Sequence, residues 1–130
     1  MEPIDTGDAV GFSTADVEIG DRRLMVALAD TSELRRRGLM EVEDLGQLDG
    51  MLFVMDVTRR SAFTMRNTRI PLHIAFFDDE GHLVDLLEMT PCDAEPCQSY
   101  RPGDPFRYAV EAPLGSFDDL GADERFSIKR

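Results

Sequence analysis

The chain lacks long hydrophobic runs, and its first residues lack the basic and then apolar regions of a secretory signal peptide. Its apolar runs, such as Leu24–Ala29 and Met51–Met55, are far shorter than the roughly 20 residues of a transmembrane helix, so we expect no membrane span. We expect the sequence as given to be cytoplasmic, and exported only if a leader segment has been removed ahead of Met1.

Basic residues are few, and lysine is nearly absent. The 14 Lys and Arg residues stand against 26 Asp and Glu, which gives a net charge of −12 at pH 7, and Lys129 is the single lysine. Affinity for nucleic-acid phosphates and anionic lipids comes mainly from basic side chains, so we expect no nucleic-acid partner. An acidic chain poor in lysine is typical of adaptation to high salt, where screening removes charge repulsion. We interpret the chain as halophilic; an arginine-biased genome is the alternative.

Cysteine and histidine are also scarce. Zinc usually takes four Cys, His or carboxylate ligands, and the two cysteines and two histidines are poorly spaced for such a set; we predict no metal and no cofactor. The seven methionines lack the spacing of a copper site and are predicted to fill the core. Cys92 and Cys97 are a potential disulfide that would stabilise a small loop by about 2 kcal/mol. Two thiols in a reducing compartment remain the alternative.

Alternating apolar and polar residues predict a mainly β protein. Residues 1–14 are expected to form a flexible tail, and residues 15–130 one domain, expected to be a monomer. Gly20-Asp21 predicts a hairpin turn, and Asp30 with Glu33 predicts the start of a helix over Thr31–Arg37, ended by Gly38. Strands are expected at Val17–Ile19, Leu24–Leu28, Met51–Met55, Ala62–Arg66, Leu72–Asp78, His82–Met89, Phe106–Ala112 and Glu124–Lys129. The pattern favours a single-domain antiparallel sandwich or barrel of seven or eight short strands with one short helix.

Three motifs stand in order along the chain: Gly38-Leu39-Met40, then Gly50–Phe53 (GMLF), then Phe63–Ile74 (FTMRNTRIPLHI). Together they resemble the pattern of the DUF192 (UPF0127) proteins, which runs GLM, GMLF and F-W-M-K-N-T-x-I-P-L-D-I. The resemblance implies a mainly β fold. The chain departs from this pattern at Thr64, where the family usually has Trp, at Arg66 in place of Lys, and at His73 in place of Asp.

The polar triplet Arg66-Asn67-Thr68 lies between apolar flanks and is our candidate ligand-binding surface. The resemblance places Arg37 and Met40 beside it, and Glu111, in a stretch similar to the family's Y-V-L-E, as the carboxylate that braces an arginine. We expect this surface to bind a small anionic or hydroxyl-rich molecule or a protein partner. In the alternative interpretation, the triplet is a side-chain-to-backbone turn in which Arg66 pairs with a neighbouring carboxylate.

A binding domain without catalysis is the leading functional interpretation. The alternative is an enzyme for a small or saccharide-like substrate, with Glu111 or Asp78 as its carboxylate and Arg66 as an anion clamp. We expect His73 to be a half-buried strand residue that shares a face with Ala75 and not to be a catalyst. The usual motifs of serine hydrolases, phosphate loops and zinc proteases do not occur in the sequence.

Overall fold

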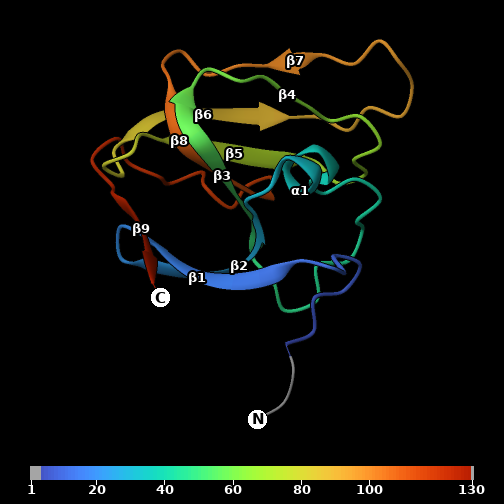
Figure 1. The fold of residues 1–130 in the computed structure, drawn as a ribbon, viewed down its shortest axis with the longest axis horizontal. Helices are drawn as coiled ribbons and strands as arrows, with labels where there is room; N and C mark the ends of the chain where they lie inside the picture. Colours follow the sequence, from blue (N-terminus) through green and yellow to red (C-terminus); the bar gives the residue numbers. More distant parts are fainter. Residues whose placement is uncertain (1–3, 130) are drawn as a thin grey trace.

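The computed structural model describes residues 4–129 and shows a mainly β protein (Figure 1). It contains one short helix, α1 (Ser32–Arg37). The strands are β1 (Ser13–Ile19), β2 (Arg22–Ala29), β3 (Gly50–Arg59), β4 (Phe63–Thr64), β5 (Leu72–Phe77), β6 (Leu83–Met89), β7 (Ser99–Tyr100), β8 (Phe106–Pro113) and β9 (Phe126–Lys129). No helix in the described part of the chain is long and apolar enough to cross a membrane.

Seven of the strands form one strongly curled sheet in the order β6-β5-β8-β3-β2-β1-β9, and β4 pairs with β7 in a small second sheet. The two edges of the large sheet meet at one end, where His82 bridges to Arg125 and the Phe126 N–H donates to the Gly81 carbonyl at 2.8 Å. The sheet is therefore a partly closed barrel. All its strand pairs are antiparallel except β2 with β3, which is parallel because the connection through α1 carries the chain back across the sheet.

The sheet has an apolar core on each face. The core inside the curl takes residues from all seven strands of the large sheet. Its fully buried members include Val17, Ile19, Val26, Leu52, Ala75, Phe77, Val110 and Phe117. The outer core lies between the sheet and a cover made of α1, the small sheet and the loops beside them. It includes Met51, Phe53, Met65, Ile74, Phe76 and Phe106.

Local chemistry explains the first elements of the chain. The β1–β2 hairpin turns at Gly20, with φ 61°, as the Gly-Asp pair predicted. The helix begins as predicted, but its N-cap is Thr31 and not Asp30: Thr31 Oγ1 accepts a hydrogen bond from the Leu34 N–H at 3.2 Å. Gly38 ends the helix with φ 50°, and its N–H bonds to the Leu34 carbonyl.

Two other regions differ from the expected pattern. The strand expected at Ala62–Arg66 is reduced to the two residues of β4, because the next residues form single bridges with Cys92 and not a continuous ladder. Within the first 14 residues, Ala9 is fully buried, and the Asp8 carboxylate accepts hydrogen bonds from the N–H groups of Glu43 and Asp44. The domain boundary at residue 15 stays a prediction.

Candidate functional site

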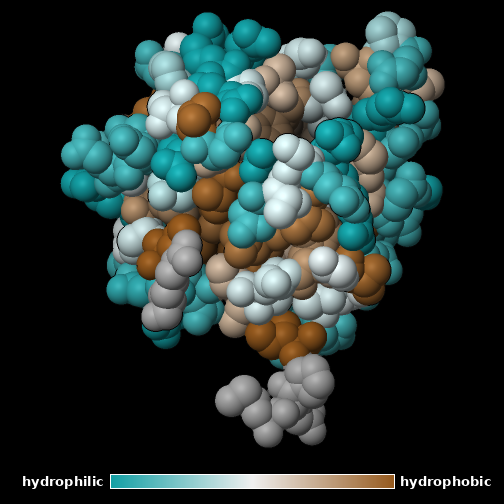
Figure 2. All heavy atoms as spheres, in the orientation of Figure 1, coloured by the Kyte–Doolittle hydropathy of each residue, from teal (hydrophilic) through white to brown (hydrophobic). Residues whose placement is uncertain are grey.

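A pocket of about 280 Å³ lies between α1 and the outer face of the sheet; we call it the α1 pocket. Figure 2 shows apolar residues in the middle of the face on which Figure 1 places α1, with hydrophilic residues around them. The pocket draws on all three sequence motifs and on β8. Its lining residues are Arg35, Arg36, Arg37, Gly38, Leu39, Met40, Phe53, Met55, Ser61, Ala62, Phe63, Thr64, Thr68 and Glu111.

Strand register places Glu111 in this pocket. Glu111 is on β8, in the middle of the sheet, opposite Met51 on β3 and Ile74 on β5. Both of these neighbours belong to the outer core, so the Glu111 side chain lies on the same face. Gly50 permits the close approach of β3, because a Cβ there would lie 1.9 Å from the Glu111 carbonyl oxygen. The GMLF motif therefore positions this carboxyl.

Glu111 is a buried carboxyl without a partner. Only 4% of the residue is exposed, and within residues 4–129 no hydrogen-bond donor or cation contacts its carboxyl group. Removal from water raises the pKa of Glu111 to about 8, because burial penalises the charged form. At neutral pH the group is therefore mostly protonated, and it can donate a hydrogen bond into the pocket, or lose its proton to the solvent when a cation binds beside it.

Three consecutive arginines of α1 line the same pocket. Arg35 donates to the Val54 carbonyl at 2.9 Å. The Arg37 guanidinium lies over the Phe12 ring, with Cζ 4.5 Å from the ring centroid. Arg36 is exposed and, in the part of the chain that the structure describes, has neither a hydrogen bond nor an ion pair. Arg36 is thus the arginine available to an anion, whereas the sequence motifs favoured Arg37.

The predicted triplet does not form one surface. Arg66 pairs with Glu95 at 3.6 Å across exposed side chains, and it does not line the α1 pocket. Asn67 has a left-handed backbone, φ 55°, and borders a second hollow of about 540 Å³ beside Arg69, which Thr68 also lines. Thr68 is 6% exposed and reaches the α1 pocket. The structure thus joins Arg37, Met40, Thr68 and Glu111 and leaves Arg66 and Asn67 outside.

The backbone of the triplet is held by the cysteine loop. The Asn67 N–H donates to the Cys92 carbonyl at 2.9 Å, and the Cys92 N–H donates to the Met65 carbonyl at 3.2 Å. Cys92 forms a disulfide with Cys97, with Cα atoms 5.9 Å apart, which is within the span of a disulfide. Thr68 Oγ1 donates to the Arg66 carbonyl at 3.3 Å. The Thr68 bond and the Arg66–Glu95 pair are contacts of the alternative interpretation, whereas the bonds to Cys92 join the triplet to a distant segment.

His73 and Asp78 lie away from the pocket. His73 is 2% exposed, more buried than expected, and its ring stacks on that of Phe117 with the centroids 6.1 Å apart. Its Nδ1 accepts hydrogen bonds from the N–H groups of Gly115 and Phe117, at 3.2 and 3.3 Å. Asp78 accepts hydrogen bonds from two N–H groups of its own turn, which ends at His82. Both side chains therefore organise loops.

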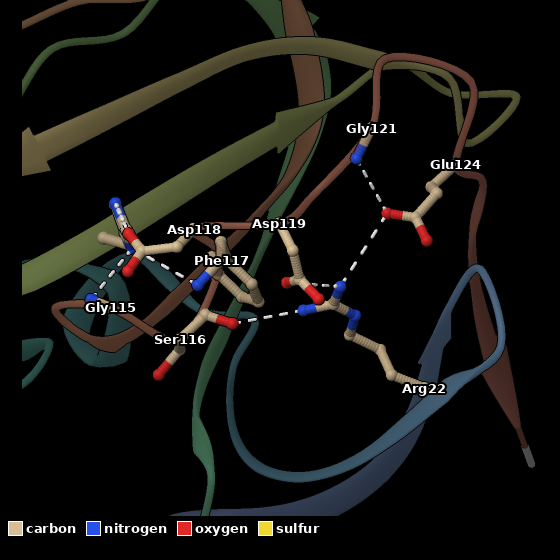
Figure 3. A network of polar contacts seen from close by, with 9 residues as sticks. Arg22, Gly115, Ser116, Phe117, Asp118, Asp119, Gly121 and Glu124 are labelled. Carbon is tan, nitrogen blue, oxygen red and sulfur yellow. Dashed lines mark hydrogen bonds and ion pairs between the residues drawn. The ribbon is translucent and has the colours of Figure 1, made fainter.

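The loop after β8, which His73 holds, also forms hydrogen bonds with Arg22 of β2. Arg22 donates to the Ser116 carbonyl at 3.1 Å and to Asp119 at 3.0 Å, and lies 3.9 Å from Glu124 (Figure 3). Hydrogen bonding to Arg22 holds the pKa of Asp119 below its usual value. This network is structural, because each polar group in it bonds to another part of the chain.

The pocket has an aromatic wall that was not predicted from the sequence. Phe63 packs edge-on against Phe53, with centroids 5.1 Å apart, and against Phe76 at 5.7 Å. Thr64 lines the pocket where the family pattern has Trp, so a smaller side chain occupies that wall. Phe63 belongs to the third motif, which marks it as a candidate. Its aromatic neighbours could not be predicted, because Phe53 and Phe76 lie on strands distant in the sequence.

Comparisons with known proteins identify relatives. Residues 15–128 match the family model DUF192, described as Uncharacterized ACR. A Sinorhizobium meliloti 1021 protein, described as a candidate transcription regulator, has a similar structure: TM-score 0.80 and 24% identity, covering 92% of this chain and 96% of the other. A protein of unknown function from Novosphingobium aromaticivorans DSM 12444 gives a TM-score of 0.79 and 24% identity, covering 99% and 94%. No curated protein matches the chain. At this identity the two structures show the fold alone.

Proposed function

The chain belongs to the DUF192 family, and we propose that it is a binding domain whose α1 pocket accepts a small anionic, hydroxyl-bearing molecule. One observation carries this proposal: a buried carboxyl without a partner, Glu111, lines a pocket that three arginines also line. Buried polar groups in proteins are nearly always hydrogen-bonded. Among the described residues no fully buried side-chain polar atom lacks a partner, so the carboxyl oxygens of Glu111 open to the pocket, where a ligand can bond to them.

The opening of the pocket favours an anion. Arg36 has no counter-ion among the described residues, in a chain whose net charge is −12. A guanidinium presents a planar fork of N–H donors that matches a carboxylate or a phosphate. The pocket volume, about 280 Å³, is just below the range of ordinary ligand pockets, which begins at about 300 Å³. The ligand is therefore small.

A catalytic role for Glu111 is the second candidate. A carboxyl with a pKa of about 8 is suited to act as a general acid near neutral pH. The pocket lining contains one carboxyl, whereas glycoside hydrolysis usually uses two. Arg66, the proposed anion clamp of the enzyme interpretation, lies outside the pocket. The geometry favours binding over that paired chemistry.

Binding of nucleic acid has little support. The description of one structural neighbour as a candidate transcription regulator applies to that protein. In this chain the charge of −12 opposes contacts with phosphate backbones.

A thermal-shift screen tests the proposal. The probes are gluconate, glycerate, malate and inorganic phosphate. A ligand that binds only the folded state stabilises it, by about 2.7 kcal/mol at a concentration of 100 times its Kd, and so raises the melting temperature. We expect at least one probe to give a shift that both Glu111→Gln and Arg36→Gln reduce. Arg23→Gln, at an exposed arginine on β2, is the matched control. A shift that survives both pocket substitutions would place binding elsewhere, and a screen without shifts would contradict the proposal.

A further inference from the structure

We infer that the ligand of the α1 pocket is a short zwitterion, an amino acid or a close analogue, whose ammonium meets Glu111 and whose carboxylate meets Arg36. This inference rests on the proposed function: it keeps the α1 pocket and the anion at Arg36, and it replaces the hydroxyl at the Glu111 end by an ammonium. The two groups are of opposite kind and line one pocket of about 280 Å³. A ligand that spans them must present a donor at the buried end and an anion at the arginine end.

The buried end of the pocket offers hydrogen-bond acceptors. Glu111 and Thr68 are the two polar residues of the lining that are almost fully buried, 4% and 6% exposed. The Thr68 hydroxyl already donates to the Arg66 carbonyl at 3.3 Å, so toward the pocket its oxygen acts as an acceptor. An ammonium carries three donors and no acceptor. It therefore complements this end of the pocket better than a hydroxyl, which has only one donor.

Glu111 also lacks a counter-charge. The arginines that line the same pocket do not form an ion pair with it, and Arg35 and Arg37 are bound to the backbone and to an aromatic ring. A buried carboxylate is favourable when a cation and hydrogen bonds accompany it. A ligand ammonium would supply both, and it would convert the neutral carboxyl into a paired carboxylate.

The remaining lining fits a short apolar body. Phe53, Phe63, Met40 and Met55 lie along the walls, and the Phe53 and Phe63 rings are packed edge-on at 5.1 Å. These side chains can cover the aliphatic part of a small amino acid, and Arg36 remains at the solvent side to bind its carboxylate. The arrangement discriminates against simple amines, which leave Arg36 unpaired, and against simple acids, which leave Glu111 unpaired.

Binding of a zwitterion moves one proton. In the free protein Glu111 holds a proton below about pH 8. When a ligand ammonium binds, the Glu111 carboxyl ionises, the carboxylate pairs with the unchanged ammonium, and the released proton goes to the buffer. A hydroxy acid would leave Glu111 protonated and release none. Proton release therefore separates the two ligand classes.

Isothermal titration calorimetry of the full chain at pH 6.5 tests the inference. The twenty protein amino acids and 4-aminobutyrate are screened first, and the tightest is compared with its hydroxy-acid, deaminated and decarboxylated analogues; for leucine these are 2-hydroxy-4-methylpentanoate, 4-methylpentanoate and 3-methylbutylamine. We expect the amino acid to bind at least tenfold more tightly than each analogue. Titrations in buffers of different ionisation enthalpy should show release of about one proton per ligand.

Two variants assign the two ends. Glu111→Gln should abolish both the proton release and the preference for the amino acid over the hydroxy acid. Arg36→Gln should weaken binding of the amino acid at least tenfold and leave the affinity for the decarboxylated amine unchanged. Arg23→Gln should bind both as the wild type does. If hydroxy acids or simple acids bind as tightly as amino acids and release no proton, the inference of a zwitterionic ligand is wrong and the proposed function still stands. If neither this panel nor the earlier anions bind, both fail.

Discussion

Replacement of Glu111 by Gln should change how the stability of the domain depends on pH. The pKa of Glu111 is raised from 4.5 to about 8 in the folded state by burial. Between these values the unfolded chain has lost the proton and the folded chain keeps it. The folded state therefore binds more protons, and its stability falls as pH rises through this window. The stability due to protonated Glu111 is fully present below about pH 4.5 and lost above about pH 8.

The expected size follows from the same pKa values. Each pKa unit corresponds to 1.36 kcal/mol, so a change from 4.5 to about 8 makes ionisation of Glu111 cost the folded state up to about 5 kcal/mol. That is a large part of the roughly 5–15 kcal/mol that stabilises an ordinary domain. Glutamine has nearly the same volume and does not ionise, so the variant lacks this contribution.

Urea denaturation of both proteins from pH 5 to pH 9, without ligand, measures the effect. The free energy of unfolding of wild type minus that of Glu111→Gln should fall by about 1.4 kcal/mol per pH unit up to pH 8 and then level off. The slope is the diagnostic quantity, because the Gln amide has its own constant cost of burial. Glu80→Gln, at an exposed glutamate, should run parallel to the wild type. A difference that stays constant across this range would refute the reasoning, since Glu111 would then be ionised in the folded protein.

Three further predictions concern the scaffold. Gly50→Ala should lower the free energy of unfolding by about 3 kcal/mol or more, because its Cβ would lie 1.9 Å from a backbone oxygen; Gly121→Ala, with open space around its Cβ, should change it by less than about 0.5 kcal/mol, and equal urea midpoints would contradict this. Cys92→Ser with Cys97→Ser should lower it by about 2 kcal/mol, as should dithiothreitol on the wild type; an unchanged melting temperature in both would show that the cross-link contributes nothing. The melting temperature should rise by more than about 4 °C between 0.1 M and 2 M KCl, because salt screens the net charge of −12; an unchanged midpoint would leave an arginine-biased genome as the explanation of the composition.

The elements that could be predicted are those that local chemistry determines. Gly20 predicts its hairpin because the turn needs a positive φ, and Gly38 ends the helix for the same reason. The parallel pairing of β2 with β3 could not be predicted, because it depends on a crossover between segments about 25 residues apart. The two-residue length of β4 depends on Cys92, which is distant in the sequence.

The candidate site shows the same division. Met40, Thr68 and Glu111 were found because they belong to recognisable motifs, and they do meet in one pocket. Arg66 was expected beside them because it follows Met65 in a polar triplet. Its side chain instead pairs with Glu95 in the cysteine loop, an arrangement that tertiary contacts decide. Arg36 could not be distinguished from its neighbours in sequence, because the difference lies in which arginine has a partner.

The two apolar cores on opposite faces of one sheet separate the maintenance of the barrel from the recognition of a ligand. Residues of the α1 pocket come from the outer core and its cover, and none of them belongs to the core inside the curl. Substitutions at Met40, Ser61 or Thr64 can therefore alter the size and polarity of the pocket while the interior packing stays as it is. The fold is a scaffold whose specificity can diverge by a few changes on one face, and a library confined to these positions is a practical starting point for redesign.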